Sequence, residues 1–70
     1  MISVEHIARL AELYDRYNNA LDPLSENARD AKRRFHELAG NLHSTHAPDV
    51  DFVAFRFDLV QKCREYLRKN

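Results

Sequence analysis

The chain has 70 residues with 11 basic and 11 acidic side chains, so its formal net charge is zero. This length supports one hydrophobic core, and we expect residues 1–70 to form a single domain. The balanced charge argues against strong electrostatic binding to nucleic acid or to an anionic membrane. One glycine and two prolines are too few for the turns of a many-stranded β fold.

The single cysteine, Cys63, rules out a disulfide within the chain and suits a reducing compartment. No apolar run approaches membrane-spanning length, and the N-terminal residues lack the basic start and apolar stretch of a signal peptide. We therefore expect a small soluble protein of the cytoplasm that does not contact a membrane.

The first predicted helix covers residues 3–19. Ser3 is a favoured N-cap residue, and Glu5 complements the positive end of the helix dipole. Apolar side chains then recur every three or four positions, which is typical of an amphipathic helix with one buried side. These side chains are Ile7, Leu10, Tyr14, Tyr17 and Leu21.

The second predicted helix covers residues 23–42. Asp22 is a suitable cap, and Pro23 suits the first helical position. Gly40 either closes this helix or lies within it, so the end is expected between residues 39 and 44. The apolar side is formed by Leu24, Ala28, Ala31, Phe35, Leu38 and Leu42.

The third predicted helix covers residues 49–69, with Asp49 as its cap. Its apolar side is formed by Phe52, Phe55, Leu59, Cys63 and Tyr66. Because Cys63 lies near the centre of this side, we expect a buried thiol that behaves as a small hydrophobic group rather than as a nucleophile.

Three amphipathic helices of similar length predict an all-α protein folded as an antiparallel three-helix bundle. An intertwined helical dimer is the alternative, because the apolar phase continues unbroken from the first helix into the second. In that case the two helices would merge into one long helix kinked at Pro23. A proline inside a helix costs about 3 kcal/mol, whereas at the first turn it costs little, so we favour two helices.

A second stripe on the third helix is the candidate interface. It consists of Val53, Phe57, Val60 and Arg64, which share one side of the helix away from the apolar side. An aromatic residue beside valines and an arginine is typical of the central residues of protein interfaces.

Arg56 joins this candidate interface for a different reason. It falls inside the apolar side of the helix, where an unpaired guanidinium is costly to bury. We expect it to pair with Glu12 or Glu37, or to lie at an interface.

The function favoured by these patterns is a small non-enzymatic module for protein–protein interaction. Its partner would be another protein or its own copy, as in a homodimer. No paired carboxylates, nucleophile–base set or phosphate-binding loop can be assembled from the chain, so we expect neither catalysis nor a cofactor.

Two alternatives remain open. The first is a metal- or ligand-binding bundle that uses His36, His43 and His46, although no Glu-x-x-His motif supports it. The second is a nucleic-acid-associated regulator that uses Lys32, Arg33 and Arg34. Spacing offers a simpler explanation for these arginines, since Asp30 and Glu37 are placed to pair with them along the helix.

Overall fold

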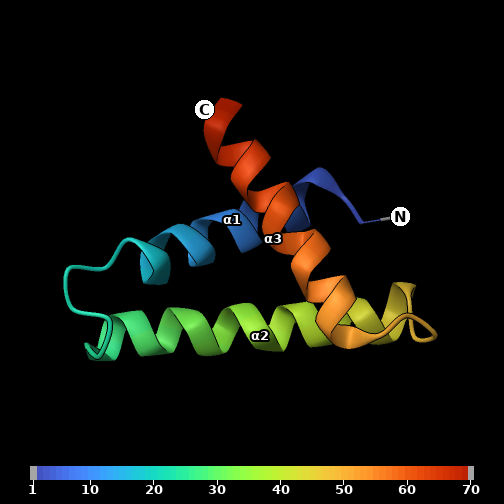
Figure 1. The fold of residues 1–70 in the computed structure, drawn as a ribbon, viewed down its shortest axis with the longest axis horizontal. Coiled ribbons are helices and arrows are strands. Elements are labelled where there is room, and N and C mark those ends of the chain that lie inside the picture. Colours follow the sequence, from blue (N-terminus) through green and yellow to red (C-terminus); the bar gives the residue numbers. More distant parts are fainter. Residues whose placement is uncertain (1, 70) are drawn as a thin grey trace.

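The computed structural model describes residues 2–69, and within that range it contains three helices and no strand (Figure 1). Helix α1 spans Val4–Asn18, α2 spans Glu26–His46 and α3 spans Phe52–Lys69. All three helices pack against one another, which confirms the all-α three-helix bundle. The merged long helix is wrong, because the chain reverses direction between α1 and α2 (Figure 1).

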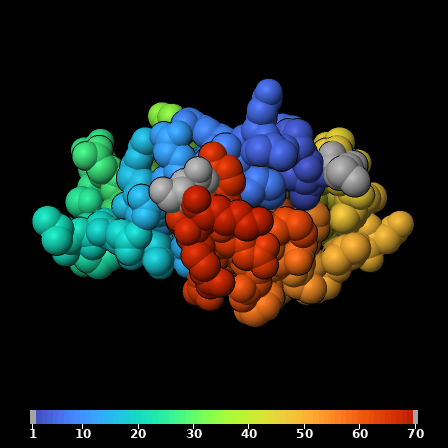
Figure 2. All heavy atoms as spheres, turned by 90° about the horizontal axis from the view of Figure 1, so that it is seen from above, coloured from blue at the N-terminus to red at the C-terminus, as the bar shows by residue number. Residues whose placement is uncertain are grey.

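The helices form two layers. Helices α1 and α2 run antiparallel in one layer, and α3 crosses one face of that pair at a steep angle (Figure 1). It packs more extensively against α1 than against α2. Seen from above, α3 lies along one side of the molecule beside α1, and its outer side is covered by no other segment in this view (Figure 2).

Local hydrogen bonds mark where α1 begins and ends. The Ser3 hydroxyl accepts a hydrogen bond from the backbone N–H of His6 at 3.2 Å, as the sequence predicts for an N-cap. At the other end the backbone N–H of Asn19 donates to the carbonyl of Asp15. The helix therefore stops before Leu21, which is 107% exposed, so its predicted place on the apolar side is wrong.

Helix α2 begins three residues later than predicted, because its cap is Ser25 rather than Asp22. The Asp22 carboxylate accepts the backbone N–H of Leu24 at 3.0 Å and so forms a tight turn that contains Pro23. The Ser25 hydroxyl then accepts the backbone N–H of Ala28 at 3.2 Å, which starts the helix. Leu24 lies in the turn and is 77% exposed, not buried as predicted.

The connection between α2 and α3 is shorter than predicted. Helix α2 continues through Gly40 to His46, beyond the expected end between residues 39 and 44. Helix α3 starts at Phe52 because Asp51, not Asp49, supplies the cap. Its carboxylate accepts the backbone N–H of Ala54 at 3.2 Å, and its carbonyl accepts that of Phe55.

The core lies where the two layers meet. Its largest fully buried side chains come from all three helices and are Phe35, Leu10, Leu13, Leu59 and Cys63. The ring of Phe35 packs against those of Tyr14 and Tyr17, with centroid distances of 6.1 and 5.7 Å. The small side chains of Ala31 and Ala39 are also fully buried, which lets α1 approach α2 closely.

Gly40 is a helical position where a larger residue would make the protein more stable. It lies inside α2 without a positive φ angle, and a Cβ atom added there would meet nothing within 4 Å. We expect Gly40→Ala to raise the free energy of unfolding by roughly 0.5–1 kcal/mol, since glycine is the poorer helix former. Urea denaturation followed by circular dichroism measures this change. An unchanged or lower urea midpoint would contradict the open surroundings of this position.

Candidate protein interface

The predicted stripe lies on the outer side of α3. Val53 is 62% exposed and Phe57 is 65% exposed, whereas Val60 is half-buried against the core. Arg64 is exposed one turn beyond Val60. We call these four residues, Val53, Phe57, Val60 and Arg64, the α3 stripe.

One apolar neighbour of this stripe was not predicted from the sequence. Val50 lies in the turn before α3, three positions before Val53, and it is 47% exposed. The apolar spacing that marks the stripe extends back to Val50, so the sequence pattern could have indicated this residue. Val50 adds apolar surface at the start of the stripe.

Arg64 is held in place by a buried tyrosine. Its Nε donates a hydrogen bond to the hydroxyl of Tyr14 at 3.2 Å, across 50 positions of sequence. Tyr14 itself is buried, so only its hydroxyl reaches the edge of the core. This bond limits the freedom of the Arg64 side chain before any partner binds, which lowers the entropic cost of using it in an interface.

Arg56 is half-buried, and its partner is not one of the two predicted carboxylates. Its Nη1 donates to Nε2 of His36 at 3.4 Å. Both predicted partners are engaged elsewhere, since Glu12 pairs with arginines of α1 and Glu37 pairs with Arg33. The prediction of a pair with Glu12 or Glu37 is therefore wrong. The steep crossing of α3 brings Arg56 to the side of α2 that carries His36.

The tautomer of His36 follows from its two contacts. Its Nδ1 lies 2.9 Å from the carbonyl oxygen of Lys32, which can only accept, so Nδ1 carries the proton. Nε2 is then free to accept from Arg56.

The Arg56 charge also acts on Tyr17. Burial and the neighbouring Tyr14 raise the pKa of Tyr17, and the positive charge of Arg56 opposes this shift. Arg56 is therefore a residue of the bundle as much as of the candidate interface.

The three histidines of the metal-binding alternative do not come together. His36 is bound to Lys32 and Arg56, and His43 donates through Nε2 to the carbonyl of Val50 while its ring packs edge-on against Phe52 and Phe55. Within residues 2–69 no group of three or more histidine, cysteine, aspartate or glutamate side chains is arranged to hold a metal ion. His36 and His43 join α2 to α3 and its preceding turn.

Cys63 is fully buried, as predicted. Burial raises the pKa of its thiol to about 11, because the charged thiolate is poorly solvated in the core. The thiol therefore stays protonated at neutral pH and lacks the thiolate that a nucleophile requires.

Two residues of the basic run of α2, Arg33 and Arg34, are paired as their spacing predicts. Arg33 bridges Asp30 and Glu37 at 2.7 and 2.8 Å, and Arg34 contacts Asp30 at 2.9 Å. These exposed pairs occupy much of the positive charge that a phosphate backbone would need.

Comparison with known proteins gives no match, whether to a protein family, to a curated protein or to a solved structure. None of the helices within residues 2–69 combines the length and the apolar composition needed to cross a membrane.

Proposed function

We propose that this chain is a small non-enzymatic interaction protein that binds a second copy of itself through the α3 stripe. The single observation that supports this is the exposure of Phe57, which lies beside exposed Val53 on an ordered helix. An exposed phenylalanine flanked by apolar residues and an ordered arginine has the composition of an interface centre.

The distribution of charge along α3 favours a second copy over a different partner. Residues 49–58 carry three carboxylates and one cation, whereas residues 59–69 carry four cations and one carboxylate. A twofold axis through the stripe would lay two copies of α3 antiparallel, with each acidic half facing the other copy's basic half. A zero net charge removes the overall repulsion between copies.

We also propose that the protein works in the cytoplasm. The support is its one cysteine, which is held in the core as a free thiol and takes part in no disulfide within the chain.

Phe57→Ala tests this proposal. We expect it to weaken self-association at least tenfold, because truncation of a central aromatic residue commonly costs about 2 kcal/mol or more. Helical content should stay the same, since the side chain is largely exposed. Sedimentation equilibrium over a range of protein concentrations measures the dissociation constant.

Leu21→Ala is the matched control, because Leu21 is also an exposed apolar residue but lies in the α1–α2 connection. It should leave association unchanged. Arg68→Glu should weaken association by reversing a charge in the basic half of α3. A monomer at every concentration up to about 1 mM, equivalent to binding weaker than about −4 kcal/mol, would overturn the proposal. So would equal effects of Phe57→Ala and Leu21→Ala.

A further inference from the structure

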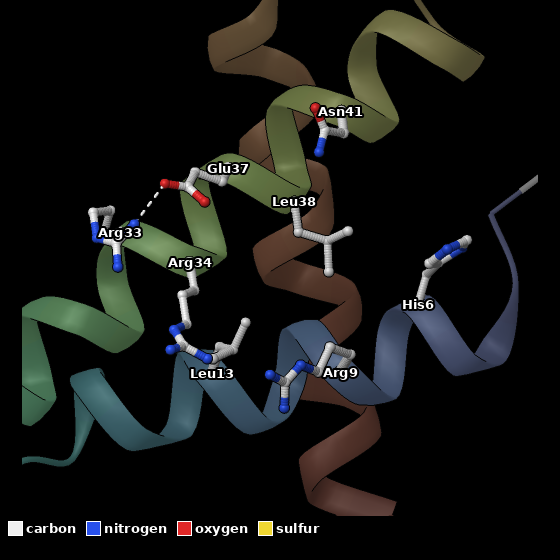
Figure 3. Close-up of a pocket in the computed structure, with 8 residues that line it drawn as sticks. All are labelled: His6, Arg9, Leu13, Arg33, Arg34, Glu37, Leu38 and Asn41. Carbon is white, nitrogen blue, oxygen red and sulfur yellow. Dashed lines mark hydrogen bonds and ion pairs between the residues drawn. The ribbon is translucent and has the colours of Figure 1, made fainter.

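A groove runs between α1 and α2 on the face opposite α3 (Figure 3). We call it the arginine groove. It is lined by Arg9 and Leu13 from α1, by Arg33, Arg34 and Leu38 from α2, and by neighbouring polar residues including Glu37. Its volume is about 540 Å³, within the range of roughly 300–1,000 Å³ that small-molecule sites occupy.

Positive charge is in excess around the arginine groove. Glu12 is shared by Arg9 and Arg16, and Asp30 is shared by Arg33 and Arg34, so each carboxylate serves two cations. Only Glu37 has a single arginine partner. The ion pairs around the groove therefore join four arginines to three carboxylates.

The charges of the two helices act on one another across the groove. The pKa of Asp30 is lowered most by a hydrogen bond from Arg33. Desolvation opposes this shift, and the charges of Arg34, Arg33 and Arg16 each lower the pKa by a smaller amount. Arg16 belongs to α1 whereas Asp30 belongs to α2, so an arginine of α1 contributes to the potential along α2. An anion between the helices would be attracted by both sets.

Two of these arginines, Arg34 and Arg9, have N–H groups that are available to bind a ligand. Arg34 contacts Asp30 through Nε, and neither of its Nη groups donates a hydrogen bond to any atom of residues 2–69. Arg9 uses only Nη1, for a long 3.4 Å contact with Glu12, and its Nε and Nη2 donate to no atom of residues 2–69. Figure 3 shows Arg34 reaching from α2 towards α1 and the Arg9 guanidinium lying along α1, on either side of Leu13.

The floor between them is apolar. Leu13 is almost fully buried beneath the groove and Leu38 is half-buried at its side. The aliphatic stems of the arginines add to this surface, because long cationic side chains cover apolar neighbours with their methylene groups. A ligand with an anionic head and an apolar body would meet both kinds of surface.

We propose that the arginine groove binds a small aryl or alkyl phosphate, whose phosphate bridges Arg9 and Arg34 while its apolar body lies on Leu38. Guanidinium groups bind phosphate through paired charge-assisted hydrogen bonds, and the donors described above are available for them. The groove lies on the face of the α1–α2 pair opposite α3 (Figure 3) and shares no lining residue with the α3 stripe, so this inference does not depend on self-association.

A small phosphate fits better than a nucleic-acid strand. A strand needs a continuous row of unpaired cations for its successive phosphates. Arg33 is held at both ends by Asp30 and Glu37, which interrupts such a row. The structure therefore offers one bridging position between Arg9 and Arg34.

Phenyl phosphate is a suitable probe, with binding followed by amide chemical shifts of the ¹⁵N-labelled protein. We expect saturable shifts confined to the groove, and at least tenfold weaker binding of inorganic phosphate and of phenol, which each lack one half of the probe. Arg9→Gln and Arg34→Gln should each weaken binding of phenyl phosphate about tenfold. Arg29→Gln, which removes an exposed arginine of α2 outside the groove, should have no effect.

Circular dichroism of each variant shows whether the fold is kept, and Asp30 retains Arg33 as a partner when Arg34 is replaced. Equal binding of phenyl phosphate and inorganic phosphate would overturn the proposal, as would shifts that never saturate or that Arg9→Gln and Arg34→Gln leave unchanged. Tighter binding of a single-stranded oligonucleotide at the same phosphate concentration would also overturn it, in favour of nucleic acid.

Discussion

Replacing Phe35 with alanine is expected to lower the free energy of unfolding by about 3–5 kcal/mol. The side chain is fully buried, and its ring packs against those of Tyr14 and Tyr17 on the facing helix. Alanine would leave a cavity between α1 and α2 that these aromatic rings can close only in part. Small domains have free energies of unfolding near the lower end of about 5–15 kcal/mol, so this single loss would leave much of the protein unfolded at room temperature.

Urea denaturation monitored by far-ultraviolet circular dichroism measures the effect. Phe57→Ala is a matched control, because it removes the same atoms from a largely exposed position. It should change the free energy of unfolding by less than about 0.5 kcal/mol. A loss below about 1 kcal/mol for Phe35→Ala would contradict its place at the centre of the core.

The amphipathic spacing predicted the core well because burial in a helical bundle is set by which side of each helix a residue occupies. Leu10, Phe35 and Leu59 were all expected on apolar sides and are all fully buried. The same reasoning failed at Leu21 and Leu24, which continue the apolar spacing but are exposed. Spacing identifies a side of a helix only where a helix exists, and between α1 and α2 there is none.

The ends of the helices were predicted less well, because several residues compete to cap each one. Both Asp22 and Ser25 are favoured cap residues, and the sequence pattern does not rank them. In the structure Asp22 closes the turn that contains Pro23, which leaves Ser25 to cap α2. The same competition occurs between Asp49 and Asp51 at the start of α3, where Asp51 forms the cap.

The candidate interface was predicted in composition but not in its supporting contacts. The position of Phe57 outside the core follows from helical geometry alone. The bonds from Arg56 to His36 and from Arg64 to Tyr14 join residues 20 and 50 positions apart. They depend on how α3 crosses the other two helices, which the sequence pattern does not encode. The arginine groove was not predicted either, because it depends on which side chains α1 and α2 bring together when they pack.

The docking of α3 onto the other helices depends most on Leu59. This side chain is fully buried at the middle of α3, with Phe55 and Cys63 buried one turn before and after it. Leu59→Ala is expected to lower the free energy of unfolding by about 2–5 kcal/mol, because the crossing helices cannot both collapse into the space it leaves. Thermal or urea denaturation followed by circular dichroism measures the loss.

Val53→Ala is the control for this prediction, since Val53 lies on the same helix but is 62% exposed and should cost less than about 0.5 kcal/mol. The unfolding of Leu59→Ala also tests whether α3 unfolds together with the other two helices. If α3 docks cooperatively, tyrosine fluorescence and helical content should be lost together in Leu59→Ala, because Tyr14 is bound to α3 through Arg64. Loss of tyrosine signal at lower urea than loss of helix would instead mean that α3 detaches while α1 and α2 remain paired. The α3 stripe would then belong to the least stable part of the fold, and any partner that binds it would stabilise the bundle by holding α3 in place.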